Sequence, residues 1–292
     1  MDDLHIVTVV SESKYYFPYL EESCERNGKE LEVLGLGEKW TGFNFKYKKM
    51  VEYLKTLPEN DIVCFVDGYD VICVRDLNDI KEQFLEIKEK TGCKMIVGHD
   101  KLIITELLRL FSSLYFGNCD GQYLNSGTYI GYVKDVFEIL IDIIRKSPND
   151  DADDQKTLTE YCNKNPKEIY IDKDNEVFLA MAYPNLQLDD LLTIKDDSVI
   201  YNGKKPFFLH AMAGGNLENT LRKLGYSIND DIKNKLYYDN IKKSFSLPYR
   251  KFVMFIIMFF LMSIVYLYYF HSINKVLLKI VKRGLNTIGK ID

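Results

Sequence analysis

The stretch Asp61-Ile62-Val63-Cys64-Phe65-Val66-Asp67-Gly68-Tyr69-Asp70 decides how the rest of the chain is interpreted. Its apolar part, Ile62–Val66, is short and rich in β-branched and aromatic residues, which is typical of a buried parallel strand. Simple alternation along a strand would place the following carboxylates, three residues apart, on opposite faces. Gly68 gives the backbone the freedom for Asp67 and Asp70 to converge. The stretch therefore predicts a strand that turns sharply and presents two oxygen ligands.

Converging carboxylates at the end of a strand have two interpretations. Hard oxygen ligands suit Mg²⁺ or Mn²⁺, and such ions commonly accompany a phosphate-bearing substrate. Alternatively, the two aspartates cap backbone amides in an Asx-type turn and bind no ion. The stretch by itself leaves both interpretations open.

Strand and helix patterns alternate around this strand. Their order is 4–10 (strand), 15–27 (helix), 31–36 (strand), 45–57 (helix), 62–66 (strand), 77–90 (helix) and 94–98 (strand). This succession predicts a Rossmann-like α/β fold with a mostly parallel sheet and flanking helices. Ligands bind such sheets at the carboxyl ends of the strands, so a ligand site is expected at Asp67 and Asp70.

Composition excludes some classes of protein. With 292 residues, 47% of them hydrophobic, the chain is long enough to bury an ordinary core. The net charge of −5 and the lack of a dense basic patch with interleaved aromatic residues argue against binding of nucleic acid. The six cysteines include no CxxC pair, so a zinc site is not expected. Their scatter fits a reducing compartment without excluding an oxidising one.

The C-terminal part of the chain predicts attachment to a membrane. Residues 252–270 carry no charge, and as a helix they would span roughly 28 Å, close to the hydrocarbon core of a bilayer. Basic residues are balanced on the two sides, so the positive-inside rule sets no orientation. Because no secretory signal opens the sequence, the large domain is expected on the cytosolic side. The expected parts are a soluble domain (1–230), a basic linker (231–251), a transmembrane helix (252–270) and a basic amphipathic tail (271–292).

Two stretches in the middle of the chain carry polar groups suited to chemistry. Asn125, Ser126 and Gly127 place an amide and a hydroxyl before a β-rich run, which suits recognition of sugar hydroxyls or an ordinary turn. Asp153 and Asp154 precede a helix, where they suit either a site or N-capping and stabilisation of the helix dipole.

Two further stretches lie near residue 210. His210 ends an apolar strand and could supply an imidazole to an oxygen-rich metal site, or it could be an ordinary hydrogen-bonded histidine. The turn Gly214-Gly215-Asn216 could cradle a phosphate with backbone amides, although two glycines alone are a weak signal.

In their order along the chain, these features resemble the glycosyltransferase domain of the procollagen-lysine hydroxylases of animals and giant viruses. The resemblance covers residues 4–226 and is carried by Gly37–Trp40, Lys46, Phe65–Val71, Leu124–Gly127, Asp153–Gln155 and Leu209–His210. It implies a GT-A fold, a UDP-sugar donor, a requirement for Mn²⁺, and transfer of glucose or galactose with retention of configuration. The membrane segment has no counterpart in the resemblance.

The resemblance implies a metal site and a nucleotide site. Asp67, Asp70 and His210 match the residues that bind the metal ion, which is Mn²⁺ or, as an alternative, Mg²⁺. Trp40 and Tyr69 match aromatic residues that hold the uracil and ribose. For Trp40, the only tryptophan of the chain, burial in the core is the alternative.

The resemblance also implies residues around the sugar. Asn125, Asp153 and Asp154 match polar residues near the sugar and the acceptor, and they are the catalytic candidates. Lys46 matches a position from which a phosphate could be contacted, with a solvated helix lysine as the alternative. Gly215 could replace part of the diphosphate cradle.

The chain departs from the family pattern in several places. Gly68 stands where the family has serine, and Ala211-Met212-Ala213 stands where it has Gly-Asn-Gly. Leu179-Ala180 stands in place of a Gln-Asn pair, and a leucine-rich helix is expected over 102–114 instead of a tryptophan-bearing loop. These departures concern the diphosphate cradle and the choice of donor and acceptor.

The expected function is that of a membrane-anchored, metal-dependent glycosyltransferase. It would transfer a hexose from a UDP-sugar to a hydroxyl acceptor, such as hydroxylysine or galactosyl-hydroxylysine of a collagen-like protein. One alternative is a non-catalytic module of the same fold that binds a sugar or a protein. A Mg²⁺-dependent phosphatase of the haloacid dehalogenase type is disfavoured, because that family needs Asp-x-Asp and this chain has Asp-x-x-Asp.

Overall fold

The computed structural model describes residues 2–102, 113–182, 191–195, 198–212, 215–228, 231–243 and 251–270. They belong to two compact units, Met1–Lys242 and Lys243–Asp292. The expected leucine-rich helix over 102–114 lies almost entirely outside the described residues. The expected basic linker contains a helix, Ile232–Lys243, that belongs mostly to the first unit.

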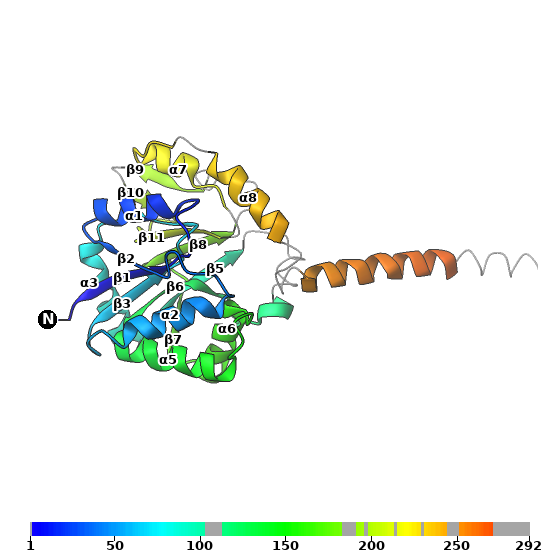
Figure 1. Cartoon of the computed structure of the whole chain (residues 1–292), viewed down its shortest axis with the longest axis horizontal. Helices are drawn as coiled ribbons and strands as arrows, with labels where there is room; N and C mark the ends of the chain where they lie inside the picture. The colour runs from blue at the N-terminus through cyan, green and yellow to red at the C-terminus, as the bar shows by residue number, and fades with distance from the viewer. Residues whose placement is uncertain are drawn as a thin grey trace, which may run out of the picture. The chain divides into compact units, whose positions relative to one another are not determined.

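Strands and helices alternate along the first unit (Figure 1). Its first half contains β1 (Leu4–Val9), α1 (Phe17–Arg26), β2 (Leu31–Leu34), α2 (Asn44–Leu54), β3 (Ile62–Val66), β4 (Val71–Cys73), the 3-10 helix η1 (Leu77–Asp79), α3 (Ile80–Thr91) and β5 (Met95–Leu102). Its second half contains β6 (Leu124–Tyr132), α5 (Val133–Lys146), α6 (Asp154–Lys164), β7 (Ile169–Asp172), β8 (Phe178–Ala182), β9 (Thr193–Lys195), β10 (Ser198–Ile200), β11 (Phe208–Met212), α7 (Glu218–Lys223) and α8 (Ile232–Lys243).

Every strand and helix predicted before residue 98 is confirmed, with ends that differ by a few residues. The boundaries follow local chemistry. Gly92, at φ 70°, has the left-handed conformation that glycine adopts without strain, and it ends α3 by donating its N–H to Lys88 O at 2.8 Å. The short strand β4 directly after Asp70 had no separate pattern, because only three residues form it.

A nine-stranded sheet forms the centre of this unit, in the order β2-β1-β3-β6-β5-β8-β11-β4, with β7 paired to β5. The pairings of β3 with β6, β6 with β5 and β11 with β4 are antiparallel, and the other five are parallel. The prediction of an α/β fold with a mostly parallel sheet is therefore confirmed.

This sheet cannot be flat. β3 and β4 lie five places apart in its order, which would separate them by about 24 Å in a flat sheet. The chain between Val66 and Val71 can extend over at most about 18 Å. The sheet must therefore curl, and the curl brings β11 and β4 toward the end of β3.

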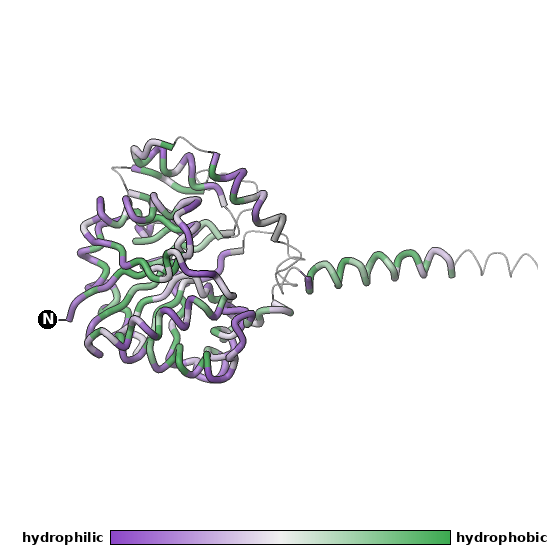
Figure 2. Tube along the Cα trace, viewed as in Figure 1, coloured by the Kyte–Doolittle hydropathy of each residue, from purple (hydrophilic) through white to green (hydrophobic). Residues whose placement is uncertain are grey.

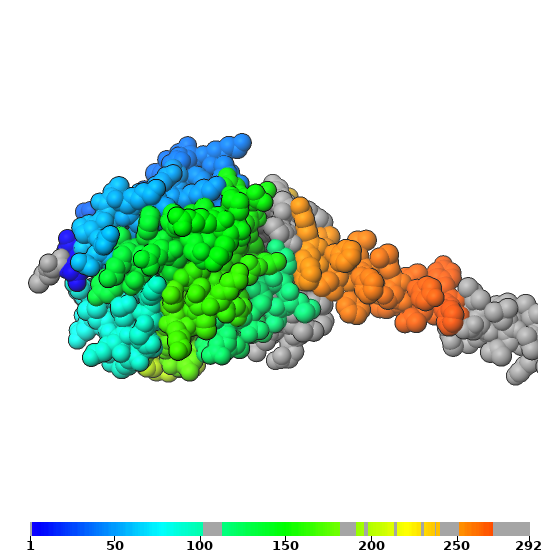
Figure 3. All heavy atoms as spheres, turned by 90° about the horizontal axis from the view of Figure 1, so that it is seen from below, coloured from blue at the N-terminus to red at the C-terminus, as the bar shows by residue number. Residues whose placement is uncertain are grey.

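Helices cover both faces of the sheet (Figure 1). α2, α5 and α6 pack on one face in a cluster that contains Phe65 and Tyr129. Figure 3 looks onto this side of the molecule, where atoms of α5 and α6 are green. α1 and α3 pack on the other face with Cys64 and Phe84. A third cluster, which contains Leu209, joins β8 and β11 to α7 and α8.

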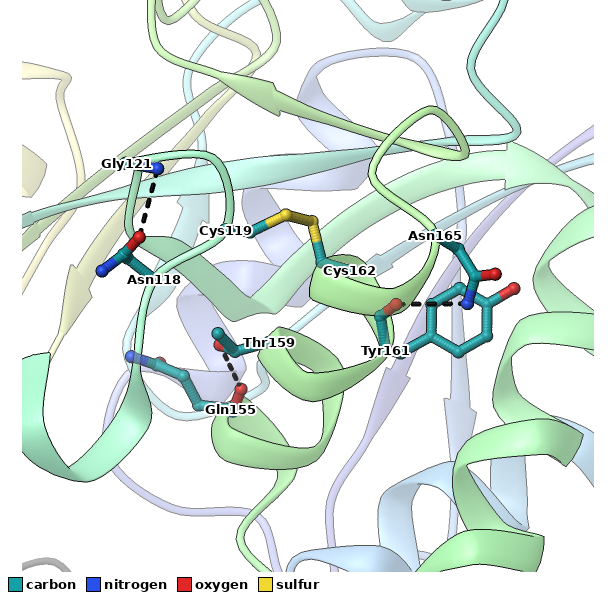
Figure 4. The surroundings of a disulfide bond; sticks show 8 residues. All are labelled: Asn118, Cys119, Gly121, Gln155, Thr159, Tyr161, Cys162 and Asn165. Carbon is teal, nitrogen blue, oxygen red and sulfur yellow. Dashed lines mark hydrogen bonds between the residues drawn. A yellow bond between two sulfur atoms is a disulfide. The ribbon is translucent and has the colours of Figure 1, made fainter.

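A disulfide joins Cys119, in the loop before β6, to Cys162 in α6, across 43 positions of sequence (Figure 4). The other four cysteines are free and buried. Disulfides persist in oxidising compartments and are rare in the cytosol. The bond therefore fits the oxidising compartment that the scattered cysteines left open. The spacing of the cysteines could not reveal it, because the pairing depends on the tertiary fold.

In the second unit, Lys251–Phe270 forms a helix of 20 residues, none of which is buried in the protein. Most of its length is hydrophobic in Figure 2. By length and composition this helix can cross a membrane, as predicted for residues 252–270. The expected amphipathic tail, 271–292, lies outside the described residues.

Candidate functional site

Asp67, Asp70 and His210 come together where β3 ends and β4 begins. One ligand atom from each side chain lies within 4.8 Å of the other two, the arrangement of a candidate metal site. β11 pairs with β4 so that His210 lies opposite Val71, next to Asp70. The ring nitrogen Nε2 of His210 is 3.1 Å from Asp70 Oδ1. His210 does not end its strand as predicted, because β11 continues to Met212.

The chemistry of this triad fits a small divalent cation. Ligands held at about 2.1 Å from an ion lie at most about 4.2 Å from one another, close to the spacing observed. Two carboxylates and one imidazole suit Mn²⁺ or Mg²⁺ better than a soft metal. Burial alone would lower the pKa of His210, but the neighbouring charges of Asp70 and Asp67 raise it. The triad is therefore an anionic site that draws positive charge.

Gly68 is required for a different reason from the one predicted. It does not have a positive φ. A Cβ at this position would collide with Val10 Cγ1, so glycine is needed where the turn approaches the end of β1. The carboxylates on either side of it contact Lys46 and His210, an arrangement that differs from an Asx-type cap.

A second pair of carboxylates begins α6. Asp153 accepts a hydrogen bond from the backbone N–H of Lys156 at 3.0 Å, so its predicted alternative as a helix cap is confirmed. Asp154 is buried and accepts a hydrogen bond from the hydroxyl of Ser126 at 2.8 Å. Burial, and then the charge of Asp154, raise the pKa of Asp153 to about 6.

Lys46 joins the two pairs of carboxylates. It lies in α2, is only 4% exposed, and forms ion pairs with Asp67 at 3.2 Å and with Asp154. Its Nζ is also 3.4 Å from Ser126 O. Burial alone would lower the pKa of Lys46, but the two carboxylates raise it.

The surroundings of Lys46 support neither of its two predicted roles. A solvated helix lysine is excluded by the burial of the side chain. An ammonium group has three donors, and three acceptors already lie around it, so this arrangement leaves none for a phosphate. Lys46 therefore links carboxylates here instead of extending toward a ligand.

The Asn125-Ser126-Gly127 segment lies inside β6 and not in a turn. Gly127 O accepts a hydrogen bond from the backbone N–H of Asp67 at 2.8 Å, which joins β6 to the end of β3. Asn125 is 4% exposed, and its Oδ1 is 3.0 Å from His210 Nδ1. The sequence singled out this segment, but did not assign the Ser126 hydroxyl to Asp154. The only sequence signal for this role of Ser126 was its place inside the Asn125-Ser126-Gly127 motif.

The two aromatic residues expected at a nucleotide have different surroundings. The hydroxyl of Tyr69 accepts hydrogen bonds from the backbone N–H groups of Ser11 and Glu12, each at 3.2 Å. Trp40 is 39% exposed, which argues against the alternative that it is a core residue, and its ring lies 5.4 Å from that of Phe45. No sequence signal indicated the backbone groups after β1, because any residue supplies an N–H.

The predicted phosphate cradle at Gly215 is not supported. Its N–H donates to Ala211 O at 3.0 Å, so this amide is already paired. A Cβ at Gly215 would lie 2.9 Å from Ala211 Cβ, so the turn after β11 needs glycine for packing. Gly214 lies outside the described residues.

Comparison with known proteins identifies relatives of this chain. The family model described as "PLOD GT domain" matches residues 1–235. The procollagen-lysine,2-oxoglutarate 5-dioxygenase of Drosophila melanogaster is 31% identical over 168 residues, covering 54% of this chain and 22% of that protein. A multifunctional procollagen lysine hydroxylase and glycosyltransferase of Caenorhabditis elegans is 29% identical over 235 residues, covering 72% of this chain and 30% of that protein.

A viral protein and a solved structure are also similar. Uncharacterized protein R699 of Acanthamoeba polyphaga mimivirus is 24% identical over 205 residues, covering 65% of this chain and 41% of that protein. The crystal structure of the galactosyltransferase LgtC with donor and acceptor sugar analogs covers 80% of this chain and 100% of its own, at 12% identity and a TM-score of 0.44. This chain thus spans less than half the length of the three relatives matched by sequence.

Proposed function

The chain belongs to the PLOD glycosyltransferase-domain family, and from this membership we propose that it transfers a hexose from a UDP-sugar to a hydroxyl acceptor in a metal-dependent reaction. The observation that carries the proposal is the convergence of Asp67, Asp70 and His210 at one edge of the curled sheet. Retention of the anomeric configuration, which the sequence resemblance implied, is part of the proposal.

The metal triad would hold Mn²⁺ or, alternatively, Mg²⁺. Such an ion, when bound, supplies positive charge to the diphosphate of the donor and so helps UDP to leave. The protein's own part is to hold the ligands in place. Lys46 fixes one oxygen of Asp67, while the pairing of β11 with β4 fixes His210 beside Asp70.

The nucleoside of the donor would lie against Tyr69 and Trp40. The backbone N–H groups after β1 hold the Tyr69 hydroxyl, so the ring presents a fixed surface for a base or a ribose. The exposed indole of Trp40 offers a second such surface.

Of the two carboxylates at the start of α6, Asp153 is the better candidate to act on the sugar or the acceptor. Asp154 is already bound by Lys46 and Ser126. Asp153 has a pKa of about 6, near the range in which a carboxylate exchanges protons at neutral pH. One of its oxygens caps α6, which fixes the orientation of the other.

Acceptor and location are inferred from the relatives and from the rest of the chain. The matched relatives include procollagen lysine hydroxylases, so hydroxylysine or galactosyl-hydroxylysine of a collagen-like protein is the proposed acceptor. The Lys251–Phe270 helix would anchor the domain in a membrane, and the Cys119–Cys162 disulfide favours an oxidising compartment for the domain. The mimivirus relative agrees with a viral source.

The proposal is tested with the full-length chain in detergent, a panel of UDP-sugars and Mn²⁺. We expect release of UDP from at least one donor, and loss of that release when EDTA removes the metal. Asp67→Asn and Asp70→Asn should each lower the rate at least about 100-fold, since metal-ion charge stabilisation contributes several kcal/mol. Asp142→Asn, on the outer surface of α5, is the matched control and should retain the rate.

A calorimetric titration with the same UDP-sugars distinguishes the glycosyltransferase from the non-catalytic module. If none of the nucleotide-sugars binds, the proposed function is wrong. Binding without turnover would favour the non-catalytic module, for which the paired amide of Gly215 is the supporting observation.

A further inference from the structure

The surroundings of Asn125 differ from its predicted role beside the sugar. Within the described part of the chain, its side chain forms hydrogen bonds with groups of the same domain. Its Oδ1 accepts from the Gly127 N–H at 3.1 Å and lies 3.0 Å from His210 Nδ1. Its Nδ2 donates to the sulfur of Met212 at 2.8 Å. These contacts tie Asn125 to the histidine of the metal triad.

The contact with Gly127 fixes which way the amide of Asn125 points. A backbone N–H can only donate, so the atom that faces it must be the oxygen of the carboxamide. The same oxygen faces His210 Nδ1, and therefore this nitrogen carries the hydrogen. In the neutral imidazole the other nitrogen, Nε2, then has the free lone pair that a metal ion needs.

The position of the ring agrees with a role of Nε2 as the ligand atom. Nε2 points toward the carboxylates and lies 3.1 Å from Asp70 Oδ1, so an ion bound by Asp70 would take the place of the proton between these two atoms. The ring can approach β6 so closely because residue 127 is glycine, since a Cβ there would collide with both His210 Cε1 and Asp67 Oδ2. One short segment of β6 therefore sets the position of two members of the triad.

We propose that Asn125 is a positioning residue of the metal centre, which accepts the Nδ1–H of His210 and thereby directs Nε2 to the ion. The inference rests on the proposed function, because it assumes that the triad binds a divalent cation. Partners of metal-bound histidines typically change metal affinity by 10–100-fold when they are lost. Asn125 acts through His210 and has no need to touch the sugar.

The first experiment measures the affinity of the full-length chain for Mn²⁺, alone and with saturating UDP, by calorimetry and electron paramagnetic resonance. Asn125→Leu removes the acceptor and should weaken Mn²⁺ binding about 10–100-fold. Asn125→Asp keeps an acceptor for both the Nδ1–H and the Gly127 N–H, and should restore the affinity to within about threefold of the wild type.

The matched control is Asn118→Leu. Asn118 Oδ1 also accepts from a glycine N–H, that of Gly121 at 3.1 Å, but Asn118 precedes the disulfide loop and makes no described contact with His210 (Figure 4). Its loss should leave Mn²⁺ affinity unchanged. Equal Mn²⁺ affinity in the wild type and Asn125→Leu would overturn the inference and leave the metal site in place. Failure of the wild type to bind Mn²⁺, even with UDP, would overturn the metal site itself.

A spectroscopic measurement on the wild type does not depend on the folding of any variant. The chain has four histidines, so long-range ¹H–¹⁵N correlations of the imidazoles can be assigned by single substitutions. With Zn²⁺ as a diamagnetic substitute, His210 should carry its proton on Nδ1. A proton on Nε2 in the Zn²⁺-bound state would contradict the proposed role of Asn125.

Discussion

The two pairs of carboxylates in this domain are chemically alike but have different partners. Asp67 and Asp70 are 34% and 20% exposed in their side chains, and together with His210 they bring three ligand atoms within 4.8 Å of one another. Asp153 caps a helix, while Asp154 is bound by a lysine and a hydroxyl. The first pair converges with an imidazole, whereas the second binds the start of a helix, a lysine and a hydroxyl.

This difference in partners is what favours the first pair as the candidate metal site. Lys46 is the side chain that connects the two pairs, since it contacts one carboxylate of each. It neutralises part of their charge. Three changes test this comparison in turn: at Lys46, at the disulfide that holds one end of α6, and at Asp153.

The largest expected effect on stability follows from Lys46→Met. This change leaves Asp154 buried beside Asp67 without its counter-ion, and removal of one member of a buried pair costs about 3–5 kcal/mol. Chemical denaturation of the full-length chain measures the free energy of unfolding.

The control for Lys46→Met lies in the same helix. Lys48 is 41% exposed and pairs with Asp150 at the surface, so Lys48→Met should cost at most about 1 kcal/mol. The double variant Lys46→Met/Asp154→Asn should lose less stability than the sum of its single changes, because the uncompensated charge is gone. Strict additivity would show that the two side chains are not coupled.

An intermediate effect is expected from the double variant Cys119→Ser/Cys162→Ser. It releases the end of α6 opposite to Asp153, and loss of a disulfide of this loop length lowers the free energy of unfolding by about 2–4 kcal/mol. The wild type under reducing conditions should denature at the same midpoint as the variant. Mn²⁺ affinity should not change, since Asp67, Asp70 and His210 lie on other elements. A loss of Mn²⁺ affinity together with the loss of stability would mean that the two pairs of carboxylates depend on each other.

The smallest effect is a change in pH dependence on Asp153→Asn. The pKa of Asp153 is raised from 3.8 to about 6 in the folded protein, so the folded state holds this proton more tightly than the unfolded state. The stabilisation from protonated Asp153 is therefore complete below about pH 4 and is lost as the pH rises through 6.

Asparagine caps a helix as well as aspartate does, so Asp153→Asn should keep α6 intact. Relative to the variant, the wild type should lose stability between about pH 4 and pH 6, as measured by urea denaturation at several pH values. The exposed neighbour Asp151 provides the control Asp151→Asn. A constant difference across this range would contradict the raised pKa.

Much of the fold was predictable because its signals are local. The apolar run Ile62–Val66 formed a strand with the predicted bounds, and the alternation of elements gave the α/β class. The cap at Asp153 was also a local signal, since an acid before a helix pairs with the first backbone amides. The helix α5 and the strands between residues 165 and 205 received no prediction, as their patterns were not separated by clear stop signals.

The candidate site was predictable in its residue types and less so in their partners. Asp67, Asp70 and His210 were named from sequence and are brought together, although their function as ligands stays a proposal. Asn125 was expected near the sugar, and Lys46 either at a phosphate or in solvent, yet both are buried and contact protein groups. The burial of a polar side chain depends on the residues that pack around it in the fold, and the neighbouring residues in the sequence do not specify these.

By itself, the sequence determined the strand that ends on Asp67, the alternation of elements and the apolar helix near residue 260, because each depends on neighbouring residues. Only the tertiary structure decided the curl of the sheet, the Cys119–Cys162 bond and the side chains that touch His210. The disulfide and the contacts of His210 join residues 43 to 140 positions apart. Such pairings depend on how the nine strands and their helices pack, which no local pattern encodes.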